Sequence, residues 1–274
     1  MDLKAFKMDG LGNDFVIIDN RQKITNLTKE QIIKICDRKF IGCDQLILIK
    51  KSETADAYLE FYNSDGGTSG ACGNGTRCVA DLLGKETNKN KINLTTLSGN
   101  LKSEILGDKL VSTEIGVGKT KWNEIPLSKD LNTKNLNIKI FDLNKNEHTG
   151  GTAINVGNPH VIFFVDNNEN FDIKKIGPEI EKHNFFPEKC NVTLATVINH
   201  GLIKVKVWER GAGLTLACGT AACATAVAAS KLGLTGKKVN IHFKNGTLHI
   251  EWAKDKHIIM TGSVSNIKNI SLKI

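Results

Sequence analysis

The sequence predicts an α/β (α+β) protein built from two pseudo-symmetric domains of common origin, each a central helix wrapped by strands. The length of 274 residues exceeds the usual range for a single domain. Two unrelated motifs also recur at nearly one spacing: Asn158 lies 145 positions after Asn13, and Cys218 lies 146 positions after Cys72. Because motifs of different character share this spacing, we infer an internal duplication.

The first cysteine motif lies in residues 62–84, where a glycine-rich loop leads to Cys72. The apolar spacing that follows predicts a short helix with Gly84 as its C-cap. Cys72 is then expected at the helix N-terminus, where unpaired N–H groups and the dipole lower the pKa of a thiol. The same donors can hold a carboxylate beside the sulfur. A buried structural cysteine at a tight turn is the alternative.

The second motif places Cys218 in the sequence Ala-Cys-Gly-Thr, which matches Ala-Cys-Gly-Asn around Cys72. A run of small residues over 221–232 predicts another helix, ended by Gly233. Alanine-rich faces let strands approach closely. Each half is therefore expected to present a thiol at the start of its central helix.

The remaining elements follow from apolar patterns and turn residues. In the first half, Ala5–Asp19 predicts two strands around a Gly-Leu-Gly-Asn turn, and a capping box of Thr28 and Gln31 predicts a helix to Cys36. Further strands are expected at Leu46–Ile49, Ala57–Tyr62, Ile92–Thr96, Leu101–Ile105 and Leu110–Ile115, with a Ser98-Gly99-Asn100 turn. In the second half we expect strand structure over Ile154–Asp166, a helix over Phe171–His183, and strands at Cys190–Ile198 and Leu202–Trp208.

The region 122–135 is polar, contains Pro126 and lacks periodicity. A domain boundary is therefore expected near residue 119, which gives domains of residues 1–118 and 119–262.

Composition restricts the class of partner. The net charge of +8 suggests nucleic acid, but only four of the 37 basic residues are arginine, and aromatic residues make up only 6%. The sequence has few aromatic residues on which bases could stack, and its basic residues are not gathered on one stretch. We therefore expect no nucleic-acid partner. The seven cysteines are an odd number and the first residues form no apolar signal region, so we expect free thiols in a cytoplasmic protein. No uninterrupted run of about 20 apolar residues predicts a membrane span.

The duplication itself indicates a chemistry. Two related domains can bring equivalent loops together at one cleft, so that the two thiols face a small-molecule substrate from opposite sides. One thiolate can remove a proton from carbon and the opposed thiol can return one on the other face, which inverts the centre. Helix N-terminal N–H groups can stabilise the charge that accumulates on an adjacent carboxylate. This chemistry needs neither a metal nor a cofactor, and we expect none.

Rival chemistries fit less well. Cys72 and Cys78 are six apart, and Cys218 and Cys223 five apart, which is not the spacing of a zinc site. Gly211-x-Gly213 lacks the third glycine of a dinucleotide motif. A Cys-His hydrolase that uses His160 stays open, although it leaves the second thiol unexplained. Air oxidation of Cys72 and Cys218 to a disulfide would inactivate the two-thiol site.

The motifs resemble those of the diaminopimelate epimerase family, cofactor-independent enzymes that interconvert LL- and meso-diaminopimelate for lysine and peptidoglycan precursors. The similarity spans nearly the whole chain, with the segments KMDGLGNDF, NSDG followed by ACGNGTRC, VGNPH and ERGAGLTLACGT. It implies two pseudo-symmetric α/β domains, a C-terminal strand over about 263–274 that returns to the first domain, and a homodimer.

Carried over by position, the resemblance implies that Cys72 and Cys218 are the acid/base pair, with Cys72 the base toward the LL substrate. His160 and Glu209 correspond to residues that support the thiols and the substrate ammonium. The positions that match substrate contacts are Asn13, Gln45, Asn63, Gly73, Asn74, Asn158, Asn191, Glu209, Arg210, Gly219 and Thr220. Arg210 suits the distal carboxylate because a guanidinium pairs with it through two hydrogen bonds. Leu214, Ala221 and the segment from Cys190 to Leu194 depart from the family pattern, so Asn191 is the assignment most in question.

Two other functions stay open at this point. A two-thiol racemase of the proline racemase kind would share the thiols, but Arg210 and the asparagines suit a substrate with a second amino-acid end. A non-catalytic small-molecule binding protein of the same fold would result if the thiols did not face one another.

Overall fold

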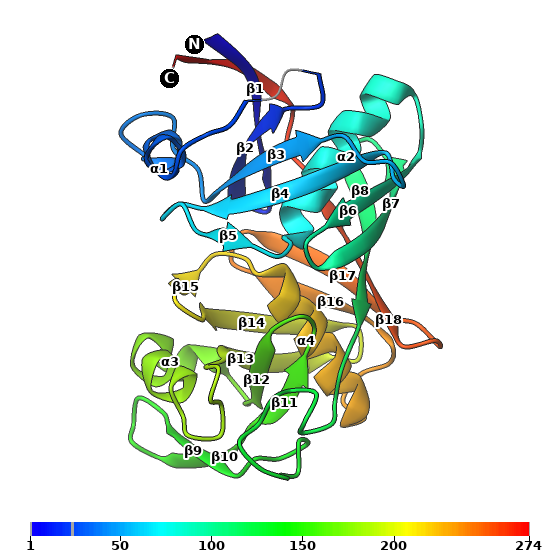
Figure 1. The fold of residues 1–274 in the computed structure, drawn as a ribbon. Helices are drawn as coiled ribbons and strands as arrows, with labels where there is room; N and C mark the ends of the chain where they lie inside the picture. Colours follow the sequence, from blue (N-terminus) through cyan, green and yellow to red (C-terminus); the bar gives the residue numbers. More distant parts are fainter. Residues whose placement is uncertain (1, 23–24, 274) are drawn as a thin grey trace. The chain divides into compact units, whose positions relative to one another are not determined.

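The computed structural model divides into two compact units. Unit 1 comprises Met1–Glu114 and Thr261–Ile274, and unit 2 comprises Ile115–Met260. Within them the structure describes residues 2–22 and 25–273, with the side chains of residues 5–22 and 25–272. Each unit is described by itself (Figure 1).

Unit 1 is a mixed sheet with one helix on each face. Its elements are β1 (Asp2–Gly10), β2 (Asn13–Asp19), α1 (Lys29–Cys36), β3 (Gln45–Lys50), β4 (Ala57–Asn63), β5 (Thr68–Ser69), α2 (Gly73–Thr87), β6 (Lys91–Thr96), β7 (Gly99–Gly107), β8 (Leu110–Val117) and β19 (Lys268–Lys273). The strand order is β19-β1-β2-β3-β4-β6-β7-β8, with β5 paired to the end of β4. β2 with β3 and β4 with β6 are the parallel pairs.

The apolar pattern of β2 explains why helices cover both faces of the sheet. Successive strand residues point to opposite faces. Phe15 and Ile17 pack in the cluster that surrounds α2, whereas Val16 and Ile18 pack in the cluster beneath α1. A strand buried on both faces is a continuous hydrophobic run. α2 is therefore held in a well-packed core, and Cys72 at its start packs against the edge of that cluster.

Unit 2 repeats this plan. Its elements are β9 (Ile138–Phe141), β10 (Glu147–Gly150), β11 (Thr152–Asn155), β12 (Pro159–Phe164), the 3-10 turn η1 (Asn168–Asn170), α3 (Ile173–Glu181), β13 (Asn191–Asn199), β14 (Leu202–Glu209), β15 (Gly213–Thr215), α4 (Gly219–Lys231), β16 (Lys238–Phe243), β17 (Gly246–Trp252) and β18 (His257–Ser263). The strand order is β11-β12-β13-β14-β16-β17, with β15 on β14.

The two units match pair by pair. β12 with β13 is parallel as β2 with β3 is, and β14 with β16 is parallel as β4 with β6 is. α4 occupies the place of α2, and all nine residues from Ala221 to Ala229 are buried. A helix that is apolar on every side is a helix surrounded by protein. The predicted class, a duplicated α/β fold with strand-wrapped central helices, is confirmed.

Two local predictions were wrong. α2 does not end at Gly84 but continues to Thr87, and Asn88 caps it in the left-handed conformation with φ 54°. Gly84 is needed for close packing, because a Cβ there would lie 2.1 Å from Ile105 Cδ1 and 2.8 Å from the Lys89 carbonyl oxygen. The turn after β6 is also shorter than expected, since β7 begins at Gly99.

The hairpin of β9 and β10 was not predicted. The described residues of unit 1 contain no equivalent of it. It pairs Ile138–Phe141 with Glu147–Gly150 in a separate small sheet. Its inward residues Ile138 and Ile140 join the core beneath α3. The hairpin therefore enlarges the α3 side of unit 2 alone.

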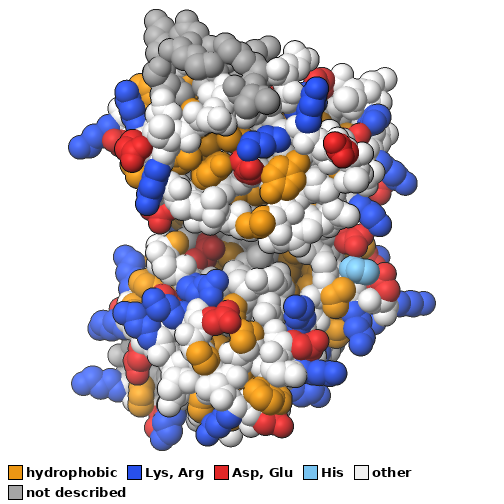
Figure 2. Space-filling view, in the orientation of Figure 1, with side chains coloured by type: hydrophobic (Ala, Val, Ile, Leu, Met, Phe, Trp, Pro, Cys, Tyr) orange, Lys and Arg blue, Asp and Glu red, His pale blue; other side chains and the backbone are white. Residues whose placement is uncertain are grey.

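Basic side chains are scattered over the face in Figure 2, interspersed with acidic and uncharged ones. Across residues 2–22 and 25–273, no helix combines the length and the apolar character needed to cross a membrane.

Candidate active site

Both cysteines of the repeated motif occupy the N-cap of a central helix. Cys72 precedes α2 with φ −142° and ψ 113°, and Cys218 precedes α4 with φ −136° and ψ 113°. Neither side chain caps its own helix. The first N–H groups of a helix have no acceptor within the helix, so each thiol lies beside donors suited to an anion.

In unit 1, Asn13 connects the thiol to its surroundings. The Asn13 Oδ1 atom accepts from the Cys72 Sγ–H at 3.7 Å and from Asn74 Nδ2 at 3.3 Å. On its other side, Asn13 Nδ2 donates to Asp44 Oδ2 at 2.9 Å. Asn74 is in turn held by the buried Arg77, whose NH2 donates to Asn74 Oδ1 at 3.0 Å. The structure thus brings together three of the predicted residues, Asn13, Cys72 and Asn74.

Gln45 and Asn63 form a second pair in unit 1. They face each other across β3 and β4, and Gln45 Nε2 donates to Asn63 Oδ1 at 2.8 Å. Gln45 begins β3, and Asn63 ends β4, directly before the loop that leads to Cys72.

In unit 2, Cys218 is 5% exposed and its Sγ lies 3.4 Å from Thr220 Oγ1. Burial raises the pKa of the Cys218 thiol well above its ordinary value of 9.0, and the Glu209 carboxylate raises it further by charge and as a hydrogen-bond acceptor. The Thr220 hydroxyl and the Ala221 N–H act in the opposite direction but do not compensate. At Cys218, desolvation thus outweighs the donors of the helix start.

His160 is the centre of a buried polar cluster in unit 2. Its Nε2 lies 2.8 Å from Asn158 Oδ1 and 3.5 Å from Asn191 Nδ2. Asn191 Nδ2 also donates to the Pro159 carbonyl at 3.0 Å, and Asn191 Oδ1 accepts from the Arg210 N–H at 3.0 Å. Burial and then the Arg210 charge lower the pKa of His160 to about 3, so the imidazole is neutral near pH 7.

Arg210 leaves β14 toward the loop before β15. Its NH1 donates to the Glu188 carbonyl at 2.7 Å, and the guanidinium retains further donors. Glu181 anchors the same loop, because its two carboxylate oxygens accept from Trp208 Nε1 at 2.8 Å and from the Gly211 N–H at 3.3 Å.

The predicted residues occupy equivalent places in the two units. Gln45 and Asn191 begin β3 and β13, whereas Asn63 and Glu209 end β4 and β14. Asn13 begins β2, and Asn158 directly precedes β12. Gly73 and Asn74 open α2 as Gly219 and Thr220 open α4.

Sequence reasoning missed Asp44 and Arg77, which contact Asn13 and Asn74, and Glu181, which holds the loop next to Arg210. Arg77 follows Asn74 by three positions, which places both on one face of α2 and was a usable signal. Asp44 and Glu181 act across loops and carry no such local signal. Among the residues that the structure describes, no group of three or more His, Cys, Asp or Glu side chains is arranged to hold a metal ion.

The fold recurs in solved structures of low sequence identity. A phenazine biosynthesis protein of the PhzF family from Bacillus anthracis matches with a TM-score of 0.69 at 15% identity and covers 100% of both chains. This chain thus belongs to the class of duplicated α/β proteins of that fold, and it places a cysteine at the start of each central helix.

The particular family is shown by sequence comparison. The family model of diaminopimelate epimerase matches residues 5–122 and 152–267. The chain is 67% identical to a diaminopimelate epimerase from Pelagibacter ubique over 100% of both chains. It is 44% identical to the one from Caulobacter vibrioides, over 97% of this chain and 96% of the relative. The chain belongs to the diaminopimelate epimerase family, which confirms the resemblance drawn from its motifs.

Proposed function

We propose that the protein is an isomerase that interconverts LL- and meso-2,6-diaminopimelate without a cofactor, in the formation of lysine and peptidoglycan precursors. The observation that carries this proposal is the pair of cysteines at equivalent helix starts, with N-cap dihedral angles that agree within about 6°. The family membership and the full-length match to named epimerases support it.

In the proposed mechanism the Cys72 thiolate removes the α proton of the LL substrate, and the carbon becomes a carbanion conjugated with its carboxylate. The Cys218 thiol then gives its proton to the opposite face of that carbon and becomes a thiolate. One S–H bond forms as one breaks, so no reductant or oxidant is required. The raised pKa of Cys218 supports its role as the acid, because it is protonated at neutral pH.

The carbanion needs donors where negative charge gathers. We assign this to the helix-start N–H groups of Gly73 and Asn74 in one unit and of Gly219 and Thr220 in the other, which lie next to the thiols in the chain. Arg210 is assigned to the distal carboxylate, and its remaining guanidinium donors support that role.

The other polar side chains are assigned to substrate orientation: Asn13, Gln45, Asn63, Asn158, Asn191 and Glu209. His160 acts as a neutral support for Asn158, consistent with its burial. Glu209 keeps Cys218 protonated at rest and can accept from the substrate ammonium.

We also propose two domains, residues 1–118 with 263–274 and residues 119–262, a cytoplasmic location and a homodimer. The antiparallel pairing of β19 with β1 supports the return of the C-terminal segment to the first domain. Analytical ultracentrifugation tests the dimer, for which the expected species has twice the chain mass of 30.0 kDa.

The function is tested with reduced protein and LL-diaminopimelate in deuterated water. We expect deuterium at one α carbon and an approach to a mixture of LL and meso forms, with L-proline left unchanged. Absence of exchange under reducing conditions, or full activity in both Cys72→Ala and Cys218→Ala, would exclude the two-thiol mechanism.

A further inference from the structure

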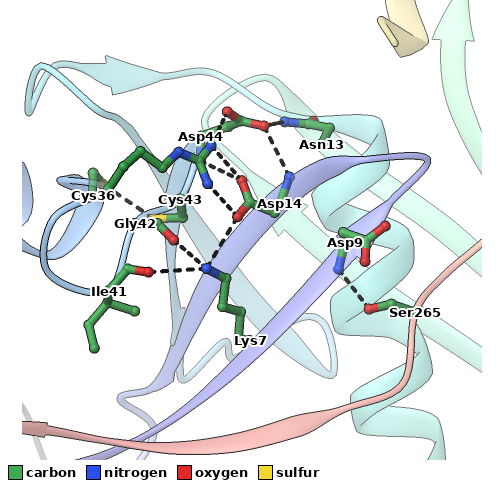
Figure 3. A network of polar contacts seen from close by, with 11 residues as sticks. Lys7, Asp9, Asn13, Asp14, Cys36, Ile41, Gly42, Cys43, Asp44 and Ser265 are labelled. Carbon is green, nitrogen blue, oxygen red and sulfur yellow. Dashed lines mark hydrogen bonds and ion pairs between the residues drawn. The ribbon is translucent and has the colours of Figure 1, made fainter. Parts of the chain in front are cut away.

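A network of charged residues contacts the Asn13 side chain through Asp44 (Figure 3). Arg38 donates two hydrogen bonds to Asp14, NH1 to Oδ2 at 2.7 Å and NH2 to Oδ1 at 2.8 Å. Arg38 NH2 also donates to Asp44 Oδ1 at 2.6 Å, and Asp44 Oδ2 accepts from Asn13 Nδ2 at 2.9 Å. One cation thus joins two carboxylates, and one of these contacts the Asn13 amide directly.

Asp44 and Asn74 both act on the orientation of the Asn13 amide, Asp44 as an acceptor for its NH2 group and Asn74 as a donor to its oxygen. A carboxylate only accepts hydrogen bonds, so the NH2 group of Asn13 must point toward Asp44. The amide oxygen is then directed to Cys72 and to Asn74. If Asp44 were unable to select the NH2 group, the amide could rotate and present N–H instead of oxygen to the sulfur.

The loop that carries Arg38 and Asp44 is itself firmly built. Gly42 has φ +75°, and a Cβ at this position would lie 2.8 Å from Arg38 Cα, so the loop folds closely onto Arg38. Lys7 Nζ donates to the Gly42 carbonyl at 2.6 Å and lies 3.3 Å from Asp14 Oδ2. The Asp44 N–H donates to the Asp14 carbonyl at 3.0 Å, which fixes the two carboxylates side by side.

Arg38 is needed because Asp14 and Asp44 repel each other without a shared cation. Burial alone raises the pKa of Asp14, but the hydrogen bonds and charge of Arg38 bring it below its ordinary value. The Arg38 fork therefore holds the ionised Asp14 carboxylate beside the Asp44 side chain.

We propose that Arg38 and Asp44 are positioning residues of the epimerase: they fix the rotamer of the Asn13 amide so that its oxygen faces Cys72 and the substrate. This inference rests on the proposed function and extends it to residues outside the substrate-contacting set. It is a property of unit 1, since Pro159 and Cys190 occupy the positions that correspond to Asp14 and Asp44.

The chain supplies a matched control at the other end of β2. Arg21 binds Asp19 through Nε at 2.9 Å and NH2 at 2.6 Å, and also binds Glu86 at 2.6 Å. This network has one arginine and two carboxylates, as the first has, but no contact with Asn13. Asp19→Asn and Arg21→Gln therefore repeat the charge changes of Asp44→Asn and Arg38→Gln away from the site.

The test compares kcat and KM for these four variants with LL- and meso-diaminopimelate. We expect kcat to fall about 10-fold or more in Asp44→Asn and at least about 3-fold in Arg38→Gln, with KM changed far less, because misplaced catalytic geometry acts on the transition state. The control variants keep the activity of the unaltered protein. Melting temperatures of all four are expected to shift by no more than about 4 °C, because exposed ion pairs contribute little to stability.

Charge alone predicts a different result. Asp44→Asn removes a negative charge and Arg38→Gln a positive one, so a purely electrostatic effect has opposite signs in the two variants. A fall in both supports positioning. Opposite effects, unchanged kcat, or equal losses in the control variants would overturn the proposal.

A second readout needs no turnover. In a Cys218→Ala background, the rate at which iodoacetamide alkylates Cys72 is followed by mass spectrometry. We expect both Asp44→Asn and Arg38→Gln to accelerate alkylation severalfold, because a rotated amide donates N–H to the thiolate; rates equal to those of the unaltered site would contradict the proposal. If the protein fails to epimerise diaminopimelate, the proposed function falls, whereas this readout still decides the role of Arg38 and Asp44.

Discussion

The two units share a backbone plan but support their equivalent asparagines in different ways. Asn13 is held by Asp44, which is solvent-exposed and tied to Arg38. Asn158 is held by His160, which is fully buried and neutral. Phe15 occupies the position in unit 1 that corresponds to His160 in unit 2. A duplicated fold has thus kept its strand register and helix starts, while the polar groups behind them have diverged.

The same contrast applies to the thiols. Cys72 is partly exposed and faces the Asn13 amide, whereas Cys218 is buried and lies beside the Glu209 carboxylate. Asn63, the counterpart of Glu209 in unit 1, carries no charge. Burial and the Glu209 carboxylate thus keep the proton on Cys218, as the role of acid requires.

The largest predicted effect concerns the buried imidazole. Because the pKa of His160 is about 3 in the folded protein and about 6.5 when unfolded, the unfolded chain binds a proton between these values that the folded protein does not. Stability due to neutral His160 is complete above pH 6.5 and falls as the pH drops toward 3. We expect about 3 kcal/mol to be lost between pH 7 and pH 4 from this group.

Urea denaturation at several pH values measures this loss, with His160→Gln as the comparison. The glutamine can still bond Asn158 but does not titrate, so the free energy of unfolding should vary less with pH. An equally steep pH dependence in the variant would show that His160 is not its source. Phe15, which occupies the corresponding position in unit 1, does not titrate and makes no such contribution.

A smaller effect on stability is expected at glycines near the C-terminal ends of the central helices. Gly84→Ala in α2 places a methyl group against Ile105 and the Lys89 carbonyl, so we expect a loss of about 1–3 kcal/mol. Gly233 follows α4 with φ +74° and open space around it, so Gly233→Ala should cost only about 1 kcal/mol through backbone strain. Thermal or chemical denaturation compares the two, and an equal cost would contradict the packing role of Gly84.

The smallest effect tests the asymmetry of the thiols. In Glu209→Gln, a negative charge and a strong acceptor beside Cys218 are removed, and both changes favour the thiolate. We therefore expect the pKa of Cys218 to fall toward its ordinary value. The pH dependence of iodoacetamide alkylation in a Cys72→Ala background measures it. A pKa that stays unchanged would show that burial alone accounts for the high value.

Several features were predictable because they depend on short segments. The glycine-rich loops and the apolar spacing that follows predicted both helix starts, and the capping box of Thr28 and Gln31 is present as expected. The offsets of 145 and 146 predicted the duplication before any contact was known.

Other features depend on packing between distant segments and had no local signal. The high pKa of Cys218 arises from burial and from a carboxylate nine positions earlier. The sequence around Gly84 is typical of a helix end, but in the structure the absence of a side chain at Gly84 leaves room for Ile105 of β7. Asp44 and Arg38 resemble ordinary surface charges, and only the fold places them behind Asn13.

The central claim, that two thiols act on opposite faces of one carbon, is tested most directly by the position of the isotope early in the reaction. LL-diaminopimelate is incubated with the reduced protein in deuterated water, and both diastereomers are isolated after a few per cent conversion. The account predicts deuterium at the inverted α carbon of the meso product and almost none in the recovered LL substrate, because each thiol carries a single proton. Equal labelling of both diastereomers, or a meso product that retains the substrate's own proton, would contradict it.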